Sequence, residues 1–190
     1  MASSLKLKLR GCTWTKDRYL ISTDPAHVPM STLIDVFASD DFYWAKTLPP
    51  SAMEEMLDNS LCFGLYELPS SPRDQDLSAP ANTEKKFIGI ARCVTDFVTF
   101  VYLTDVWVNP TYQGKGLGSW LVKCVQEVIE VMPHLRRSML FTADWGRSVP
   151  FYERIMEMQL IETKHGEGLA IMERKGRGHP SFGREGSGYN

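Results

Sequence analysis

The 190-residue sequence lacks any apolar run long enough to cross a membrane as a helix. Its opening residues, Met1–Gly11, carry lysines and an arginine but not the apolar segment of a secretory signal peptide. These two absences argue against a membrane protein and against a secreted one. We therefore expect a cytoplasmic location and no membrane partner.

Cysteine is scarce, and the four that are present follow no recognisable pattern. Cys12, Cys62, Cys93 and Cys124 show neither the spacing of a metal site nor a dense disulfide framework. All except Cys12 lie inside apolar runs, where a free thiol behaves as a small hydrophobic side chain. Cys124 is also a poor candidate for an acyl-carrying nucleophile, because no histidine is near it in the sequence. We expect reduced thiols and no metal.

An excess of positive charge is missing as well. Lys and Arg number 21 against 23 Asp and Glu, which gives a formal net charge of −2 and a pI near 6.1. Nucleic-acid-binding domains usually present a basic face, so no nucleic-acid partner is expected, and modification of histone tails or tRNA is disfavoured. The 43% hydrophobic and 23% charged content is typical of a soluble globular protein.

The length fits a single domain, which we place at residues 17–174. Residues 1–16 are polar and basic, and they predict an extended arm or a loosely held extra strand. Pro69–Lys85 is rich in Pro, Ser and Ala and predicts a loop. Residues 175–190 are rich in Gly, Ser and Arg, and they predict a flexible tail.

Apolar periodicity and turn residues predict a series of helices and strands. Strands are expected at Tyr19–Ser22, Leu61–Tyr66, Phe87–Val94, Phe97–Val108 and Ser138–Thr142. Helices are expected from Pro29 to Ala38, after Pro49-Pro50 with Ser51 and Glu54 at capping-box spacing, and over Ser148–Arg154 with Ser148 as N-cap. A hairpin of Met158–Thr163 with Leu169–Glu173 completes the domain. Short connections predict antiparallel pairing of the middle strands, and a connecting helix predicts parallel pairing of the later one.

The most informative stretch is Tyr102–Met132, which predicts a strand, a glycine-rich turn and a long amphipathic helix. Asn109-Pro110 ends the strand, because proline cannot donate to a sheet ladder. After the turn, apolar residues recur at three- and four-residue spacing from Leu117 onwards. Between them lies Gln113-Gly114-Lys115-Gly116-Leu117-Gly118. Its glycines let a ligand approach the backbone, and its N–H groups open a helix, which makes a socket for an anion such as a pyrophosphate.

Spacing separates three phosphate-binding patterns that compete for this loop. A P-loop needs four residues between its first glycine and the Gly-Lys pair, but Gly114 and Gly116 flank Lys115 directly. A dinucleotide fingerprint needs a glycine at the position of Ser119. The third pattern, Gln-x-x-Gly-x-Gly, fits the loop and begins at Gln113. The alternative is that the loop is an ordinary glycine-rich turn that binds no phosphate.

With the strand end Val-x-Val-x-Pro before it, this loop resembles the acetyl-CoA motif of the GCN5-related N-acetyltransferase (GNAT) superfamily. The resemblance covers about Tyr19 to Arg174, and the stretches STDP, YWAK, SLCFGLY, YLTDVWVNP and QGKGLGSWLV are similar to a subgroup of small microbial enzymes. It implies an α/β fold whose mixed, mostly antiparallel sheet of about six to seven strands is flanked by about four helices. It also implies acetyl-CoA as co-substrate.

The resemblance implies roles for individual residues. Backbone groups of Val106, Trp107 and Val108 would bond the pantetheine arm as an added strand does. Backbone N–H groups of the glycine loop would hold the pyrophosphate: Gln113, Gly114, Lys115, Gly116, Leu117 and Gly118, with Ser119 adjacent. Tyr152, in the Phe-Tyr-Glu motif, would protonate the departing CoA sulfur. Ser148 stands where several relatives contact CoA.

The sequence departs from the family pattern at Ile155-Met156, where relatives have Gly-Phe, and at Thr104, where several have a general-base Glu. Threonine cannot accept a proton at neutral pH, so the nearest candidate base is Asp105. Its carboxylate could deprotonate the acceptor directly or through water. The alternative is a structural carboxylate bonded to neighbouring N–H groups. His165, in the last predicted hairpin, is a weaker candidate.

In the family, the loop that contains Tyr43 and Trp44 lines the acceptor pocket, so we expect these two residues to bind substrate; core packing is the alternative. Together the assignments predict an acetyl-CoA-dependent N-acetyltransferase, a monomer or homodimer, acting on a small primary amine by direct attack on the thioester. Two alternatives remain: a catalytically silent acyl-CoA-binding module, and an acetyltransferase of protein lysines or N-termini, which would need an open groove.

Overall fold

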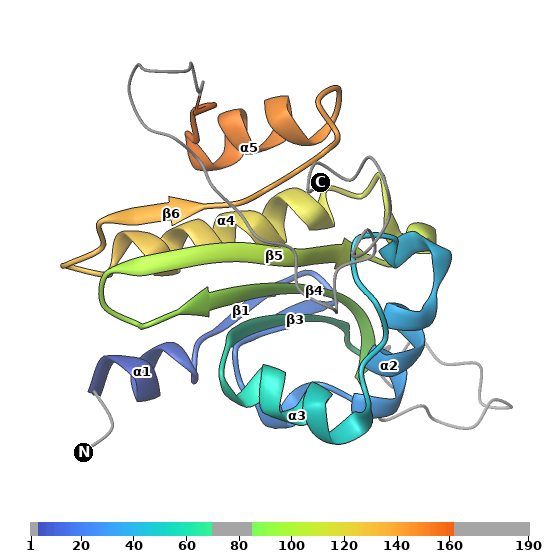
Figure 1. Ribbon diagram of the computed structural model, residues 1–190. Coiled ribbons are helices and arrows are strands. Elements are labelled where there is room, and N and C mark those ends of the chain that lie inside the picture. Colours follow the sequence, from blue (N-terminus) through green and yellow to red (C-terminus); the bar gives the residue numbers. More distant parts are fainter. Residues whose placement is uncertain (1–3, 70–84, 162–190) are drawn as a thin grey trace, which may run out of the picture.

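The computed structural model describes residues 4–69 and 85–161 (Figure 1). The helices are α1 Ser4–Leu9, α2 Met30–Ala38, α3 Pro50–Asp58, α4 Leu117–Glu130 and α5 Ser148–Met156. The strands are β1 Thr13–Lys16, β2 Tyr19–Ser22, β3 Leu61–Glu67, β4 Lys86–Thr95, β5 Phe100–Val108 and β6 Arg137–Met139. Short 3-10 turns are found at Pro25–His27, Asp40–Phe42 and Pro110–Tyr112. Within these ranges, no helix is long and apolar enough to cross a membrane.

The strands form one sheet in the order β1-β2-β3-β4-β5-β6. Every neighbouring pair from β1 to β5 is antiparallel, whereas β5 and β6 are parallel. The parallel pair arises because α4 returns the chain to the end of the sheet at which β5 begins. The predicted α/β fold with a mixed, mostly antiparallel sheet is confirmed, with six strands in the described residues.

Helices cover both faces of the sheet (Figure 1). Helices α4 and α5 contribute to a core on one face, and α2 and α3 contribute to a second core on the other. Strand β3 lies between the two cores. Leu61, Phe63 and Leu65 belong to the first core, whereas Cys62 and Tyr66 belong to the second. A strand covered on both faces reads as a continuous apolar run, which is the pattern of its sequence.

The N-terminal segment differs from its prediction. Thr13–Lys16 does form an extra strand, paired with β2, but Ser4–Leu9 is a helix where an extended arm was expected. Leu9 is buried in the first core, and Leu5 packs against the same core. Residues four apart lie on one face of a helix, so this pair gives α1 a core-facing side. The pattern is only two residues long, and the surrounding lysines obscure it.

Two predicted helix caps are wrong. Helix α3 begins at Pro50 without a side-chain cap, and Ser51 lies inside its first turn. Helix α5 begins at Ser148 itself, so Ser148 is not its N-cap. The N-cap position is held by Arg147, which makes no side-chain cap bond. The Asp144 carboxylate accepts the Arg147 N–H at 2.9 Å, and the Asp144 carbonyl accepts the Ser148 N–H at 3.1 Å.

The predicted strand Ser138–Thr142 is shorter than expected and begins one residue earlier. Strand β6 pairs only with Phe100–Tyr102 of β5, and after Met139 the chain leaves the sheet. On this side the described residues give the rest of β5 no strand neighbour, so its edge is open. The predicted final hairpin lies mostly outside the described residues, as does His165; 158–161 form no strand.

Candidate active site

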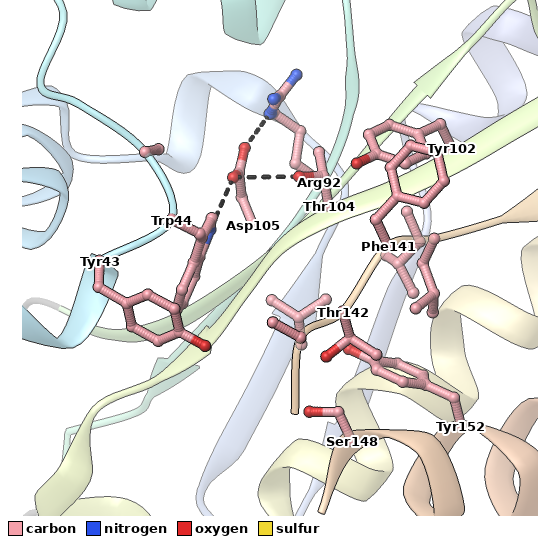
Figure 2. A pocket seen from close by; sticks show the side chains of 15 residues that line it. Tyr43, Trp44, Arg92, Tyr102, Thr104, Asp105, Phe141, Thr142, Ser148 and Tyr152 are labelled. Carbon is pink, nitrogen blue, oxygen red and sulfur yellow. Dashed lines mark hydrogen bonds and ion pairs between the residues drawn. The ribbon is translucent and has the colours of Figure 1, made fainter. Parts of the chain in front are cut away.

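A cavity of about 850 Å³ lies where β5 and β6 diverge (Figure 2). Its walls come from β5, from the segment after β6, from the start of α5 and from the loop after the Asp40–Phe42 turn. The lining residues are Tyr43, Trp44, Ala45, Arg92, Tyr102, Leu103, Thr104, Asp105, Val106, Leu140, Phe141, Thr142, Ala143, Ser148 and Tyr152. The volume lies within the usual range for small-molecule sites.

An irregularity in β5 creates part of this cavity. Arg92 faces Thr104 and Ile90 faces Trp107, so one residue of β4 lies opposite two residues of β5, Asp105 and Val106. Asp105 takes a left-handed backbone conformation with φ of 51°, which aspartate tolerates better than most residues. This β-bulge reverses the alternation of side chains along the strand. Beyond it, Trp107 is buried in the core under α2 and α3.

Asp105 is held by three side chains, and its exposed fraction is only 6%. The Nε of Arg92 donates to Asp105 Oδ2 at 2.6 Å. The indole N–H of Trp44 and the hydroxyl of Thr104 donate to Oδ1 at 3.2 and 3.3 Å. Arg92 also donates to the Ser60 hydroxyl at 3.1 Å. A buried carboxylate is tolerated because it is paired and hydrogen-bonded in this way.

The loop that contains Phe42, Tyr43 and Trp44, called the aromatic loop from here on, is held against the core by a series of ring contacts. Phe37 of α2 stacks on Phe42 at a centroid distance of 4.1 Å, and Phe42 contacts Trp44 at 4.3 Å. Trp44 in turn meets Tyr43 edge-on at 5.1 Å. The series runs from Phe42, which is 1% exposed, to Tyr43, which is 67% exposed. The rings therefore fix the loop while presenting Tyr43 at the mouth of the cavity.

Tyr152 and Ser148 approach the cavity from α5, on the side opposite the aromatic loop (Figure 2). Phe151 packs edge-on against the Tyr152 ring at 5.0 Å. Burial raises the pKa of Tyr152 to about 12, because the charged phenolate is the form that burial disfavours. The phenol therefore keeps its proton at neutral pH. In the described part of the chain, its hydroxyl has no hydrogen-bond partner.

The glycine loop has the geometry that an anion site requires. Gly114 and Gly116 have φ of 79° and 74°, and a Cβ atom built on either would meet nothing within 4 Å. Open space therefore lies over this backbone. Trp120 is the first residue of α4 whose N–H bonds back to Gly116, at 3.0 Å. The N–H groups of the preceding helical residues have no acceptor inside the helix, so the loop fits the pyrophosphate of acetyl-CoA.

Side chains around this loop hold it in place. Gln113 donates from its side-chain amide to the Val108 carbonyl at 3.1 Å, which joins the loop to the end of β5. The ammonium of Lys115 lies 4.8 Å from the centre of the Tyr112 ring. The Tyr112 hydroxyl donates to Glu67 at 2.7 Å. The Gln113 side chain therefore stabilises the loop, and the backbone N–H groups of the loop are the groups that would bind a ligand.

The structure brings some of the predicted site residues together and separates others. Tyr43, Trp44, Asp105, Val106, Ser148 and Tyr152 all line the cavity. Trp107, Val108 and the loop Gln113–Ser119 do not line it. The tryptophan side chain is turned into the opposite core, so Trp107 could meet a ligand only through its backbone groups.

Sequence reasoning missed Arg92, Tyr102, Phe141 and Thr142, which also line the cavity. One signal for Arg92 was available, because it is the only charged residue in the apolar stretch Phe87–Val94. A charge in a strand that is mostly buried needs a partner. Phe141 and Thr142 were assigned to a strand, and nothing in their sequence marked the early end of β6.

No group of three or more His, Cys, Asp or Glu residues within 4–69 and 85–161 is arranged to hold a metal ion. The four cysteines are free thiols, and Cys62, Cys93 and Cys124 are buried as predicted.

Comparison with known proteins agrees with the geometry. The model of the acetyltransferase (GNAT) family matches residues 35–158. The chain belongs to the GNAT family. A Gibberella zeae protein named "putative acetyltransferase" is 35% identical over 174 residues, which are 87% of this chain and 95% of the relative.

A solved structure supports the same assignment. A Xanthomonas campestris protein belonging to the GNAT family has a TM-score of 0.55 and 25% identity, with 85% of this chain and 95% of that chain covered.

A thialysine N-epsilon-acetyltransferase of Bos taurus is 33% identical over 85 residues, which are only 40% of this chain and 48% of the relative. The family membership implies the use of acetyl-CoA.

Proposed function

We propose that this GNAT protein transfers the acetyl group of acetyl-CoA to a primary amine of a small molecule, which attacks the thioester directly. One observation carries the proposal. Tyr152, Asp105 and Val106, which lies on the open edge of β5, all line one cavity. A proton donor, a candidate proton acceptor and a backbone edge for the co-substrate are thus available in the same space.

Backbone groups of this chain would position the co-substrate. The N–H groups of Gly114–Ser119 would hold the pyrophosphate at the positive end of the α4 dipole. The open backbone edge of Val106–Val108 would receive the pantetheine amides as an added strand does. This arrangement would bring the thioester into the cavity between β5 and α5.

Tyr152 would donate a proton to the CoA sulfur as the C–S bond breaks. The raised pKa and the lack of a hydrogen-bond partner for the hydroxyl within residues 4–69 and 85–161 support this role, because the phenol stays protonated and a thiol has an ordinary pKa of about 8.5. At neutral pH, CoA leaves more easily as a protonated thiol than as a thiolate that receives no proton. Ser148, one helical turn earlier in α5, faces the same cavity and would contact the CoA arm.

Asp105 would receive the proton that the attacking amine loses, directly or through water. Its ion pair with Arg92 and the N–H bond from Trp44 already occupy both of its oxygens. The pairing therefore supports a second role for Asp105, which is to position Trp44 on the cavity wall. A pH profile of kcat/KM separates the two, because loss of a base removes the acidic limb, whereas loss of a positioning group lowers the whole profile.

Thermal unfolding with acetyl-CoA tests the proposal first. A ligand at a hundredfold excess over its Kd stabilises the native state by about 2.7 kcal/mol. For a chain of this size that corresponds to an increase in Tm of about 5–10 °C. CoA-thiol release with a panel of amines, followed by mass spectrometry of the product, then tests transfer. Stabilisation without transfer would support the silent binding module, and much faster acetylation of peptides than of small amines would support a protein acetyltransferase.

The same proposal includes a cytoplasmic location, no nucleic-acid or membrane partner, and a monomer or homodimer. Sedimentation of the purified protein at several concentrations, with and without acetyl-CoA, measures the oligomeric state.

A further inference from the structure

We propose that the acceptor is an arylalkylamine, a molecule with one amino group and an aromatic ring and with no second charged group. This inference rests on the proposed acetyl transfer and narrows its substrate class. Two features of the cavity carry it: the mutual neutralisation of the two charged side chains among its described lining residues, and the aromatic rings on two of its walls.

Among the described residues that line the cavity, only Arg92 and Asp105 have a charged side chain. They pair with each other at 2.6 Å, and their side chains are only 15% and 5% exposed. The second Asp105 oxygen already accepts from Trp44 and Thr104. The described wall therefore offers no unpaired carboxylate for the second ammonium of a diamine or of lysine. It offers no unpaired cation for an amino-acid carboxylate either.

Four aromatic side chains among the remaining lining residues form two walls (Figure 2). Tyr43 and Trp44 make one wall, and Tyr102 and Phe141 make the other, with a ring-centroid distance of 5.5 Å between the latter pair. Tyr43 is 67% exposed and Phe141 is 55% exposed, so both rings have free surface at the cavity. An aromatic ring of the acceptor would gain edge or offset contacts with them, and a single ammonium would gain cation–π attraction.

Trp44 in the first wall is held in place before any ligand binds. Trp44 is fixed by its stack on Phe42 and by its N–H bond to Asp105. A preorganised wall loses little side-chain entropy when a ligand binds. The Arg92–Asp105 pair therefore holds Trp44 in position and does not bind a charged group of the acceptor.

A matched panel of acceptors tests the inference. The panel contains 2-phenylethylamine and tryptamine as arylalkylamines, n-hexylamine as an aliphatic monoamine, 1,5-diaminopentane, lysine and thialysine as charged competitors, and one lysine peptide. We expect kcat/KM for the arylalkylamines to exceed that of every other member by tenfold or more. Equal or faster acetylation of hexylamine, of any charged competitor or of the peptide would overturn the inference.

The outcomes also separate this inference from the proposed function. If acetyl-CoA raises the Tm and lysine or another charged amine is the best acceptor, the acetyltransferase assignment stands and the arylalkylamine inference fails. If acetyl-CoA raises the Tm but no amine is acetylated, both fail. If acetyl-CoA neither binds nor reacts, the proposed function itself is wrong.

Two exposed aromatic residues provide a matched pair of variants. Tyr43→Ala removes a lining ring, whereas Trp145→Ala removes a ring that is 70% exposed and outside the cavity lining. We expect Tyr43→Ala to raise KM for 2-phenylethylamine about five- to tenfold, with a smaller effect on hexylamine and none on KM for acetyl-CoA. Trp145→Ala should leave all three unchanged. An equal effect of Tyr43→Ala on aromatic and aliphatic amines would contradict a ring-binding wall.

Discussion

The Nε atom of Arg92 lies 2.6 Å from Oδ2 of Asp105, across the point at which β4 and β5 lose their regular register. Asp105 reaches this position because the bulge places it in a left-handed conformation. Its other oxygen binds the Trp44 indole. One ion pair thus connects two central strands to the loop that forms a wall of the cavity.

Breaking this pair should destabilise the protein strongly. Removing one partner of a buried ion pair leaves an uncompensated charge, which typically costs about 3–5 kcal/mol. We expect Asp105→Asn and Arg92→Met each to lower the free energy of unfolding by about 3 kcal/mol in urea titrations. Asn is the replacement for Asp105 because it also tolerates a positive φ.

An exposed pair gives the control. Arg147 and Asp144 lie 3.9 Å apart, and the arginine side chain is 87% exposed. Arg147→Met should change stability by less than about 1 kcal/mol. The double variant Arg92→Met/Asp105→Asn should cost less than the sum of its two single variants, because contacting residues couple. Strict additivity would mean that the two side chains do not stabilise each other in solution.

The sequence predicted the fold well because the relevant signals are local and repeated. The alternation and apolar runs of Leu61–Tyr66 and Phe87–Val94 follow from burial on one or both faces. The glycine loop could be placed because the spacing of its glycines lies between a clear strand and a clear helix, and the structure shows Gly116 at a positive φ. The bulge could not be predicted, since YLTDVWV reads as an uninterrupted strand and the extra residue is visible only against the partner strand.

Substitution of Gly116 should weaken co-substrate binding without unfolding the protein. Gly116 has φ of 74°, and a Cβ atom there would meet no protein atom within 4 Å. A non-glycine residue in this conformation costs about 1–2 kcal/mol, and its side chain would occupy the space over the loop. We expect Gly116→Val to raise the Kd for acetyl-CoA at least tenfold, measured by calorimetry. Gly146→Ala, at a glycine with ordinary φ outside the loop, should bind normally. Unchanged affinity of Gly116→Val would place the anion socket elsewhere.

Only part of the site could be predicted, and the reason is the same for each residue that was missed. Tyr43 and Trp44 were found because their loop position has a known role in the resembling family. The presence of Phe141 and Tyr102 in the cavity lining depends on the point at which β6 leaves β5, and that point is set by long-range pairing and not by local sequence. Arg92 depends on the bulge, which turns Asp105 toward it.

Alkaline pH should destabilise the protein through its buried thiols. Burial raises the pKa of Cys62 from 9.0 to about 12. The unfolded chain loses this proton above pH 9 while the folded chain keeps it, so stability is complete below pH 9 and falls as pH rises toward 12. One such group contributes up to about 1.4 kcal/mol per pH unit. Urea titrations between pH 8 and 11 should show this decline, and Cys62→Ala should make it shallower by about one proton. An identical slope in the variant would mean that the thiol is not protected by the fold.

Tyr152→Phe should abolish acid catalysis while leaving the site intact. The change keeps the ring that packs against Phe151 and removes only a hydroxyl that has no partner in the described residues. Because burial raises the Tyr152 pKa to about 12, the wild-type phenol is protonated throughout a neutral assay. Loss of a positioned acid typically costs about a hundredfold, so kcat should fall by that order while the Tm shift with acetyl-CoA is unchanged. Tyr66→Phe is the matched control, since it removes a buried hydroxyl that also lacks a partner among the described residues but lies outside the cavity lining, and its kcat should equal that of the wild type. Single-turnover measurements ensure that chemistry is observed, and a Tyr152→Phe rate close to the wild-type rate under those conditions would show that the sulfur leaves without this proton.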